Sequence, residues 1–168
     1  MIADPVRRGE ALADFALATI PRLWQDLAEG ARIPVDAAAP RHEWDCFALY
    51  ACVRGLVAAG GFNRETGASI DAFHERVLGA WAAEHGDQDD PRRAMAAGRY
   101  SEYGAIGQDG GASGAASVER RLGEACARRL MACEGFSAAI GAGELAEMAG
   151  AIHEALSEGA AEAVRIAT

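Results

Sequence analysis

The stretch RHEWDCFALYACVRGLVAAGG, residues 41–61, decides the fold of this chain. Its large apolar side chains are not confined to one stripe; they are Trp44, Phe47, Leu49, Tyr50, Val53, Leu56 and Val57. A helix that is apolar on all sides belongs in the interior of a bundle, because water would otherwise meet part of its apolar surface. Two consecutive glycines then end the pattern. We therefore predict a central, buried helix over about residues 41–59.

Helical signals continue on both sides of this stretch. Asp4 and Asp90 each precede a proline, the arrangement of an N-capping carboxylate with proline in the first helical turn. Pro21 lies inside the first segment, which is therefore either one kinked helix or two collinear halves. Apolar residues recur at steps of three and four in three segments, 5–30, 63–85 and 113–134. A further segment of this kind begins between residues 137 and 143 and ends at about residue 166.

These patterns predict an all-α fold, a compact bundle of five to seven helices. No segment alternates apolar and polar residues as a half-buried strand does. A chain of 168 residues has the length of one domain, and we assign residues 1–168 to it. Residues 31–40, with two prolines, and the glycine-rich residues 107–114 are predicted to be flexible loops.

The charged residues exclude several classes of function. All 16 basic residues are arginine, so the chain has no lysine for a Schiff base, for pyridoxal phosphate or for a Walker-A loop. A net charge of −9 disfavours nucleic-acid binding. The stretch 46–63 is interrupted by Arg54 and is too short for a bilayer span of about 20 residues. We expect a soluble protein that binds neither nucleic acid nor membrane.

The N-terminus and the cysteines indicate the compartment. The first ten residues carry arginines with no apolar region after them, so we expect no signal peptide. The four cysteines form no CxxC pair, which favours buried thiols in a reducing environment over a metal site or a disulfide framework. Both observations predict a cytoplasmic protein.

Arg54 lies inside the central helix, where its guanidinium needs a carboxylate, backbone oxygens or water. It is interpreted as a structural ion pair with Asp71, Glu75 or Glu102, as an anion anchor at the floor of a pocket, or as a side chain that reaches the surface. Tyr100 and Tyr103 are one turn apart and can pack at a helix boundary or form a pocket wall. Together with His74, these tyrosines and Arg54 are the candidate ligand-binding residues.

Histidine and carboxylate spacing gives a weak indication of a transition-metal site. Candidate ligands lie near the start of the central helix and along the next one; they are His42, Asp45, Asp71, His74 and Glu75. Carboxylate-bridged di-iron bundles use two Glu-x-x-His pairs, whereas this chain has one such spacing, with Asp in place of Glu. Solvated helix faces explain these residues more simply, so no cofactor is predicted and a transition metal stays the alternative.

His42 and Cys46 are one turn apart near a helix N-terminus, a position that lowers a thiol pKa. This spacing is compatible with a cysteine nucleophile and an adjacent base, but no third orienting group accompanies it. We therefore predict no catalytic residues.

Two helices carry opposite charges. Arg120, Arg121, Arg128 and Arg129 form two basic pairs on the fifth helix, and the last helix is acidic through Glu144, Glu147, Glu154 and Glu158. These faces can meet within one chain or across a dimer. Hence the sequence favours a non-enzymatic helical protein that acts through homo-oligomerisation or protein–protein interaction. A small-ligand-binding or metal-binding bundle with a pocket around Arg54 is the alternative.

Overall fold

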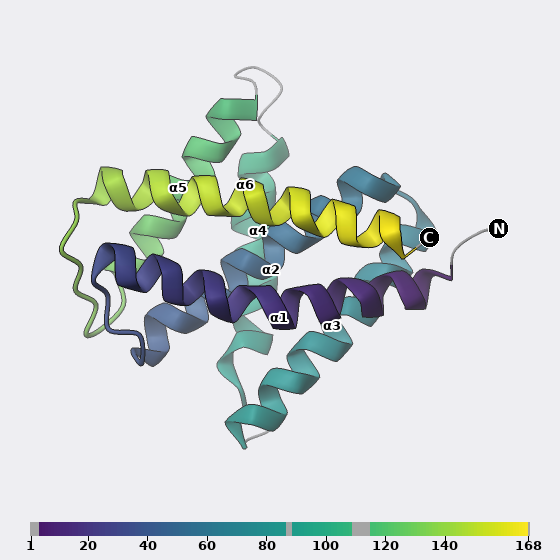
Figure 1. Cartoon of the computed structure of the whole chain (residues 1–168), viewed down its shortest axis with the longest axis horizontal. Coiled ribbons are helices and arrows are strands. Elements are labelled where there is room, and N and C mark those ends of the chain that lie inside the picture. Colours follow the sequence, from purple (N-terminus) through teal and green to yellow (C-terminus); the bar gives the residue numbers. More distant parts are fainter. Residues whose placement is uncertain (1–3, 87–88, 109–114, 168) are drawn as a thin grey trace.

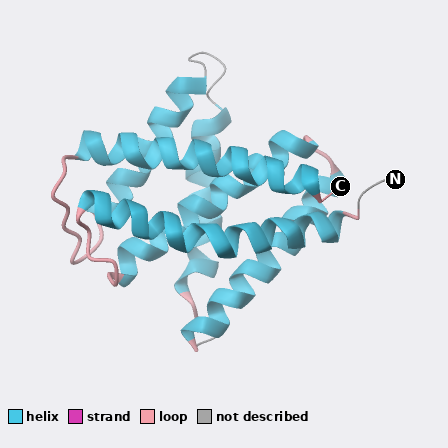
Figure 2. Cartoon of the chain, viewed as in Figure 1, coloured by secondary structure: helices cyan, strands magenta, loops and turns pink. Residues whose placement is uncertain are grey.

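A computed structural model of the chain describes residues 4–86, 89–108 and 115–167. In these ranges the chain forms six helices and no strand (Figure 2). They are α1 (Pro5–Ala31), α2 (Ala38–Gly60), α3 (Arg64–His85), α4 (Pro91–Gln108), α5 (Ala115–Met131) and α6 (Ala142–Ile166). The predicted all-α bundle is confirmed. None of the helices described is long and apolar enough to cross a membrane.

The predicted helix starts owe their positions to capping side chains. The carboxylate of Asp4 accepts a hydrogen bond from the backbone N–H of Val6 at 3.0 Å, and that of Asp90 accepts one from Arg92 at 2.9 Å. Asn63 caps α3 in the same way, through the N–H of Thr66. Each cap satisfies a backbone donor that has no partner within its helix. Pro21 lies inside α1, which is one continuous helix.

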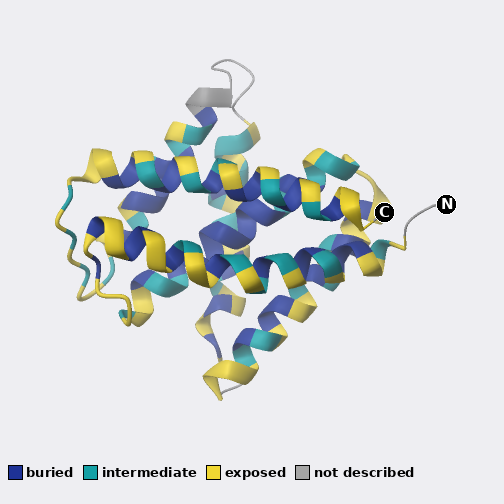
Figure 3. Cartoon of the chain, viewed as in Figure 1, coloured by how far each residue is buried: buried dark blue, intermediate teal, exposed yellow. Residues whose placement is uncertain are grey.

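The central position of α2 is confirmed. α2 packs against each of the other five helices. In Figure 1, α1 and α6 run side by side in opposite directions, with α2 behind them. Figure 3 shows the buried residues of α2 along most of its length. Its large apolar side chains meet those of α1, α3 and α4 in one core, which includes the fully buried Trp24, Trp44, Phe47, Phe73 and Tyr103.

Three helix crossings are so close that only glycine fits at them. A Cβ atom at any of these glycines would overlap a backbone carbonyl oxygen of the facing helix; the pairs are Gly9 with Ser69, Gly55 with Ser157, and Gly123 with Ala146. They join α1 to α3, α2 to α6, and α5 to α6. The helix axes can approach this closely because no side chain separates them.

The loop predicted at residues 31–40 is shorter than expected. α1 continues to Ala31 and ends where Arg32 takes a left-handed backbone conformation, with φ of 54°. α2 begins at Ala38, because Pro40 lies in its first turn, where a missing N–H costs no helical hydrogen bond. The connection is therefore residues 32–37. Of the second predicted loop, residues 107 and 108 belong to α4, and residues 109–114 lie outside the described ranges.

Candidate functional site

A network of buried ion pairs joins α2 to α4. Asp45, which is fully buried, accepts hydrogen bonds from Arg41 and from Arg92, each at 2.7 Å. Arg92 also bonds both carboxylate oxygens of Asp90 and lies over the ring of Trp81, 4.4 Å from its centroid. Burial raises the pKa of the Asp45 carboxyl, an effect that Arg41 and Arg92 oppose. Hydrogen bonds from Arg92 lower the pKa of Asp90.

The candidate metal ligands are not gathered at one point. His42 packs edge-on against His85, with ring centroids 6.0 Å apart, while both oxygens of Asp45 are occupied by arginines. On α3, Asp71 and Glu75 are exposed and His74 turns inward. The described residues contain no group of three or more His, Cys, Asp or Glu side chains able to hold a metal ion. Among these candidates, Asp45 forms ion pairs, and His42 and His74 make ring contacts.

Three of the four candidate ligand residues belong to an aromatic cluster in the core. Nε2 of His74 and the hydroxyl of Tyr100 are 2.6 Å apart, which links α3 to α4. Tyr100 and Tyr103 both contact the ring of Tyr50, at centroid distances of 5.7 and 5.6 Å. Burial lowers the pKa of His74 and raises the pKa of both α4 tyrosines. The cluster stacks α4 onto α2.

His153 of α6 completes this cluster. Its ring lies 4.5 Å from that of Phe47 and 5.8 Å from that of Tyr50, measured between centroids. It is 1% exposed, and neither ring nitrogen has a hydrogen-bond partner in the described part of the chain. Burial, and secondly the charge of Arg54, lowers the pKa of His153 to about 3. The imidazole is therefore neutral at physiological pH and behaves as an aromatic core residue.

Arg54 forms an ion pair, but not with any of the three partners proposed for it. Its Nη1 donates to Oε2 of Glu154 on α6 at 3.3 Å, whereas Glu102 pairs with Arg129 of α5. The reason is that this side of α2 faces α6. The Arg54 side chain is 27% exposed, so it lies at the edge of the core and reaches solvent.

The environment of Cys46 is opposite to that of an activated thiol. The sulfur is buried and lies 3.9 Å from the carbonyl oxygen of Arg92. Burial, followed by the nearby charges of Asp45 and Glu43, raises the pKa of the thiol to about 12. The expected lowering by the helix N-terminus is therefore wrong for this cysteine, because desolvation of the thiolate dominates.

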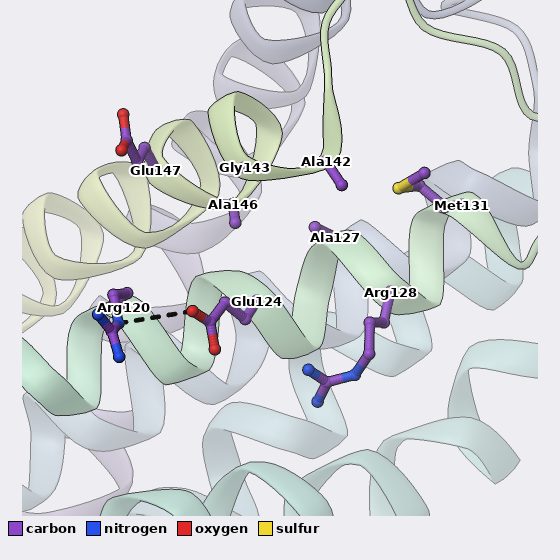
Figure 4. A pocket seen from close by; sticks show the side chains of 9 residues that line it. All are labelled: Arg120, Glu124, Ala127, Arg128, Met131, Ala142, Gly143, Ala146 and Glu147. Carbon is purple, nitrogen blue, oxygen red and sulfur yellow. Dashed lines mark ion pairs between the residues drawn. The ribbon is translucent and has the colours of Figure 1, made fainter.

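The surface where α5 crosses α6 is hollowed into a groove of about 310 Å³ (Figure 4). We call it the α5–α6 face; it is lined by Arg120, Glu124, Ala127, Arg128, Met131, Ala142, Gly143, Ala146 and Glu147. The floor consists of small residues, and Met131 at one end is 50% exposed. Arg120 pairs with Glu124 on its own helix at 3.5 Å.

Two charges on this face remain without a partner. Arg128 extends from α5 and Glu147 from α6, on opposite sides of the groove (Figure 4). Neither forms an ion pair with a described residue, and both are exposed. Of the other charged residues of the two helices, Arg129 is bound to α4 and Glu154 to α2. The close packing of α5 on α6 therefore depends on small residues such as Gly123.

Comparison of the chain with protein-family models, curated proteins and solved structures finds no match. The fold places the protein in the class of all-α helical bundles. Its candidate sites are an exposed groove between two helices and the surroundings of Arg54.

Three residues that matter in the structure were absent from the sequence candidates. Tyr50 is the centre of the aromatic cluster, and His153 lies beneath it. His153 follows Ala149 by four residues and precedes Leu156 by three, so helical spacing places it on the buried stripe of α6. Phe62 comes directly after the two glycines that end α2 and is 95% exposed. The sequence signal for Phe62 was that this aromatic residue lies outside every helical stripe.

Proposed function

We propose that this protein is a cytoplasmic helical module that acts by binding, and that it forms a homodimer through the α5–α6 face. The observation that carries this proposal is the charge balance of that face: two arginines and two glutamates surround a floor of small apolar residues. Four free cysteines, three of them buried, support a reducing compartment.

Charge repulsion determines where two copies can meet. Each copy has a net charge of −9, so most approaches bring negative surface against negative surface. The side chains that line the α5–α6 face sum to zero, which makes it a favourable place for contact. Its apolar floor and the half-exposed Met131 lose contact with water on association, and this burial stabilises the dimer.

In a dimer with two-fold symmetry, both unpaired charges of each copy, Arg128 and Glu147, would gain a partner in the other copy. In a symmetric dimer the same surface of both copies forms the interface, so that Arg128 of one copy meets Glu147 of the other and the reverse contact follows. Each contact replaces an exposed, unpaired charge by an ion pair at the rim of the interface. Such pairs contribute chiefly to the choice of partner and its orientation.

Charge reversal tests this arrangement. We expect the wild-type protein to sediment as a dimer at micromolar concentration. Arg128→Glu and Glu147→Arg should each weaken self-association by about tenfold or more, because each places two like-charge contacts in the interface. The double variant should recover the dimer.

The two single variants also provide a stricter test when they are mixed. Each repels itself, yet the mixture restores opposite charges at both contacts, so a heterodimer should form. Arg93→Glu is the matched control, since Arg93 is an exposed arginine of α4 with no ion pair among the described residues. A strictly monomeric wild type, or a mixture that stays monomeric, would contradict the proposed dimer.

A further inference from the structure

A second hollow lies between the C-terminal half of α2 and the last turns of α4. It has a volume of about 370 Å³ and is lined by Tyr50, Val53, Arg54, Val57, Ala58, Phe62, Gly104, Gly107 and Gln108. We call it the Arg54 hollow. A neighbouring hollow shares Val53, Val57 and Phe62 with it and continues to Ile70 of α3. The shared residues make one apolar track along the outer side of α2.

Phe62 indicates that this track lacks an occupant. A phenylalanine that is 95% exposed gains nothing from folding, whereas a ligand lying against it would remove its ring from water. The ring borders both hollows. An apolar body bound along Val53 and Val57 would therefore be covered from one side by Phe62.

The other end of the Arg54 hollow is polar. Arg54 is the one charged residue among those that line it, and a single hydrogen bond to Glu154 engages only one of its five N–H donors. The hydroxyl of Tyr50 faces Gly107, where a Cβ atom would come within 3.0 Å of it. No described residue forms a hydrogen bond with this hydroxyl. Two donors with free capacity thus lie at the head of an apolar track.

We propose that the Arg54 hollow binds a monocarboxylate with an aliphatic body. A guanidinium offers paired N–H donors that match the two oxygens of a carboxylate, and the Tyr50 hydroxyl adds a third donor. A cationic ligand would be repelled by Arg54, and a neutral one would leave the guanidinium without its new partner. The site shares no residue with the α5–α6 face and does not depend on dimer formation.

Glu154 makes the proposal specific. Its carboxylate holds one edge of the guanidinium and carries the same charge as the ligand. Removing that charge while keeping the shape, as in Glu154→Gln, should free Arg54 and tighten carboxylate binding several-fold. Arg54→Gln should weaken it by about tenfold or more, the effect of losing a hydrogen bond to a charged group. Opposite shifts from two neighbouring residues are not expected of nonspecific adsorption.

Titration calorimetry with three eight-carbon probes tests the site. We expect octanoate to bind and octylammonium not to bind. The affinity for 1-octanol should be lower than that for octanoate by a factor of about ten or more. Affinity should rise about fourfold per methylene from butanoate to octanoate, because each methylene is buried on the track. Arg93→Gln is the matched control and should keep the wild-type affinity, as should Arg128→Glu.

Three results would overturn the proposal. One is equal affinity for octanol and octanoate, which would make the track a docking surface for apolar side chains of another protein. Another is an Arg54→Gln variant that binds octanoate as the wild type does while its circular dichroism and melting temperature are unchanged. Failure of octanoate to bind wild-type protein at millimolar concentration would also refute it, and would leave the dimer measurement unaffected.

Discussion

Replacing His153 by phenylalanine should remove a large part of the acid sensitivity of this protein. The folded imidazole has a pKa of about 3, whereas an imidazole in the unfolded chain has its ordinary value of 6.5. As the pH falls below about 6.5, the unfolded chain takes up a proton that the folded protein does not. Proton uptake therefore favours unfolding, and this contribution to stability is lost progressively between about pH 6.5 and pH 3.

The size of the effect follows from the two pKa values. Between pH 7.5 and pH 5 the free energy of unfolding should fall by about 2 kcal/mol through His153 alone. In the His153→Phe variant this portion should be absent. At pH 7.5 the variant should be at least as stable as the wild type, since phenylalanine suits the contacts with Phe47 and Tyr50 and leaves no ring nitrogen unpaired.

Urea unfolding at pH 7.5 and at pH 5 measures the difference. Burial also lowers the pKa of His42 and His74, so the wild type should lose more than the His153 portion alone. The comparison between the wild type and the variant isolates His153. Tyr103→Phe is the matched control, because it too removes a buried hydrogen-bonding group without a partner but nothing that titrates in acid. Equal acid losses in the wild type and His153→Phe would refute the reasoning.

Two further substitutions test the packing. Arg92→Gln should lower the free energy of unfolding by about 3–5 kcal/mol, because buried Asp90 loses its ion pair and buried Asp45 keeps only the one to Arg41. The neighbouring exposed Arg93→Gln should change it by less than about 0.5 kcal/mol. Similar urea midpoints for the two would count against the buried network. Gly123→Ala should destabilise the protein by about 1–3 kcal/mol through the clash with α6, while Gly98→Ala, with no atom within 4 Å of the new methyl group, should stabilise it by about 0.5–1 kcal/mol. Calorimetric melting that moved in the same direction for both would contradict the close crossing.

Helix positions were predictable because their signals are local. Capping residues such as Asp4 and Asp90 act within one turn, and the spacing of apolar residues reports which face of a helix avoids water. The same local signals explain the error at residues 31–40. Two prolines suggested a loop throughout, yet Pro40 is compatible with the first turn of a helix.

Partners between helices were not predictable in the same way. The sequence showed that the Arg54 guanidinium needed a carboxylate, backbone oxygens or water. The choice of Glu154 over the proposed partners depends on which helix lies beside that side of α2. Likewise, the spacing of His42 and Cys46 indicated a shared helix face but not the environment of the thiol. The Cys46 thiol is buried because α4 packs on α2, and this burial raises its pKa. Such contacts depend on which helices pack together, and the spacing of residues along a single helix does not reveal this.

The close crossings at Gly9, Gly55 and Gly123 have a consequence for ancestry. Alanine-rich helical sequences resemble one another by composition alone, so overall similarity is a poor guide to common descent among them. A homologous chain, however diverged, should retain glycine at these three points, while glycines such as Gly79 and Gly98 drift freely because the space around them is open. We therefore expect the three glycines together to identify chains that share this packing.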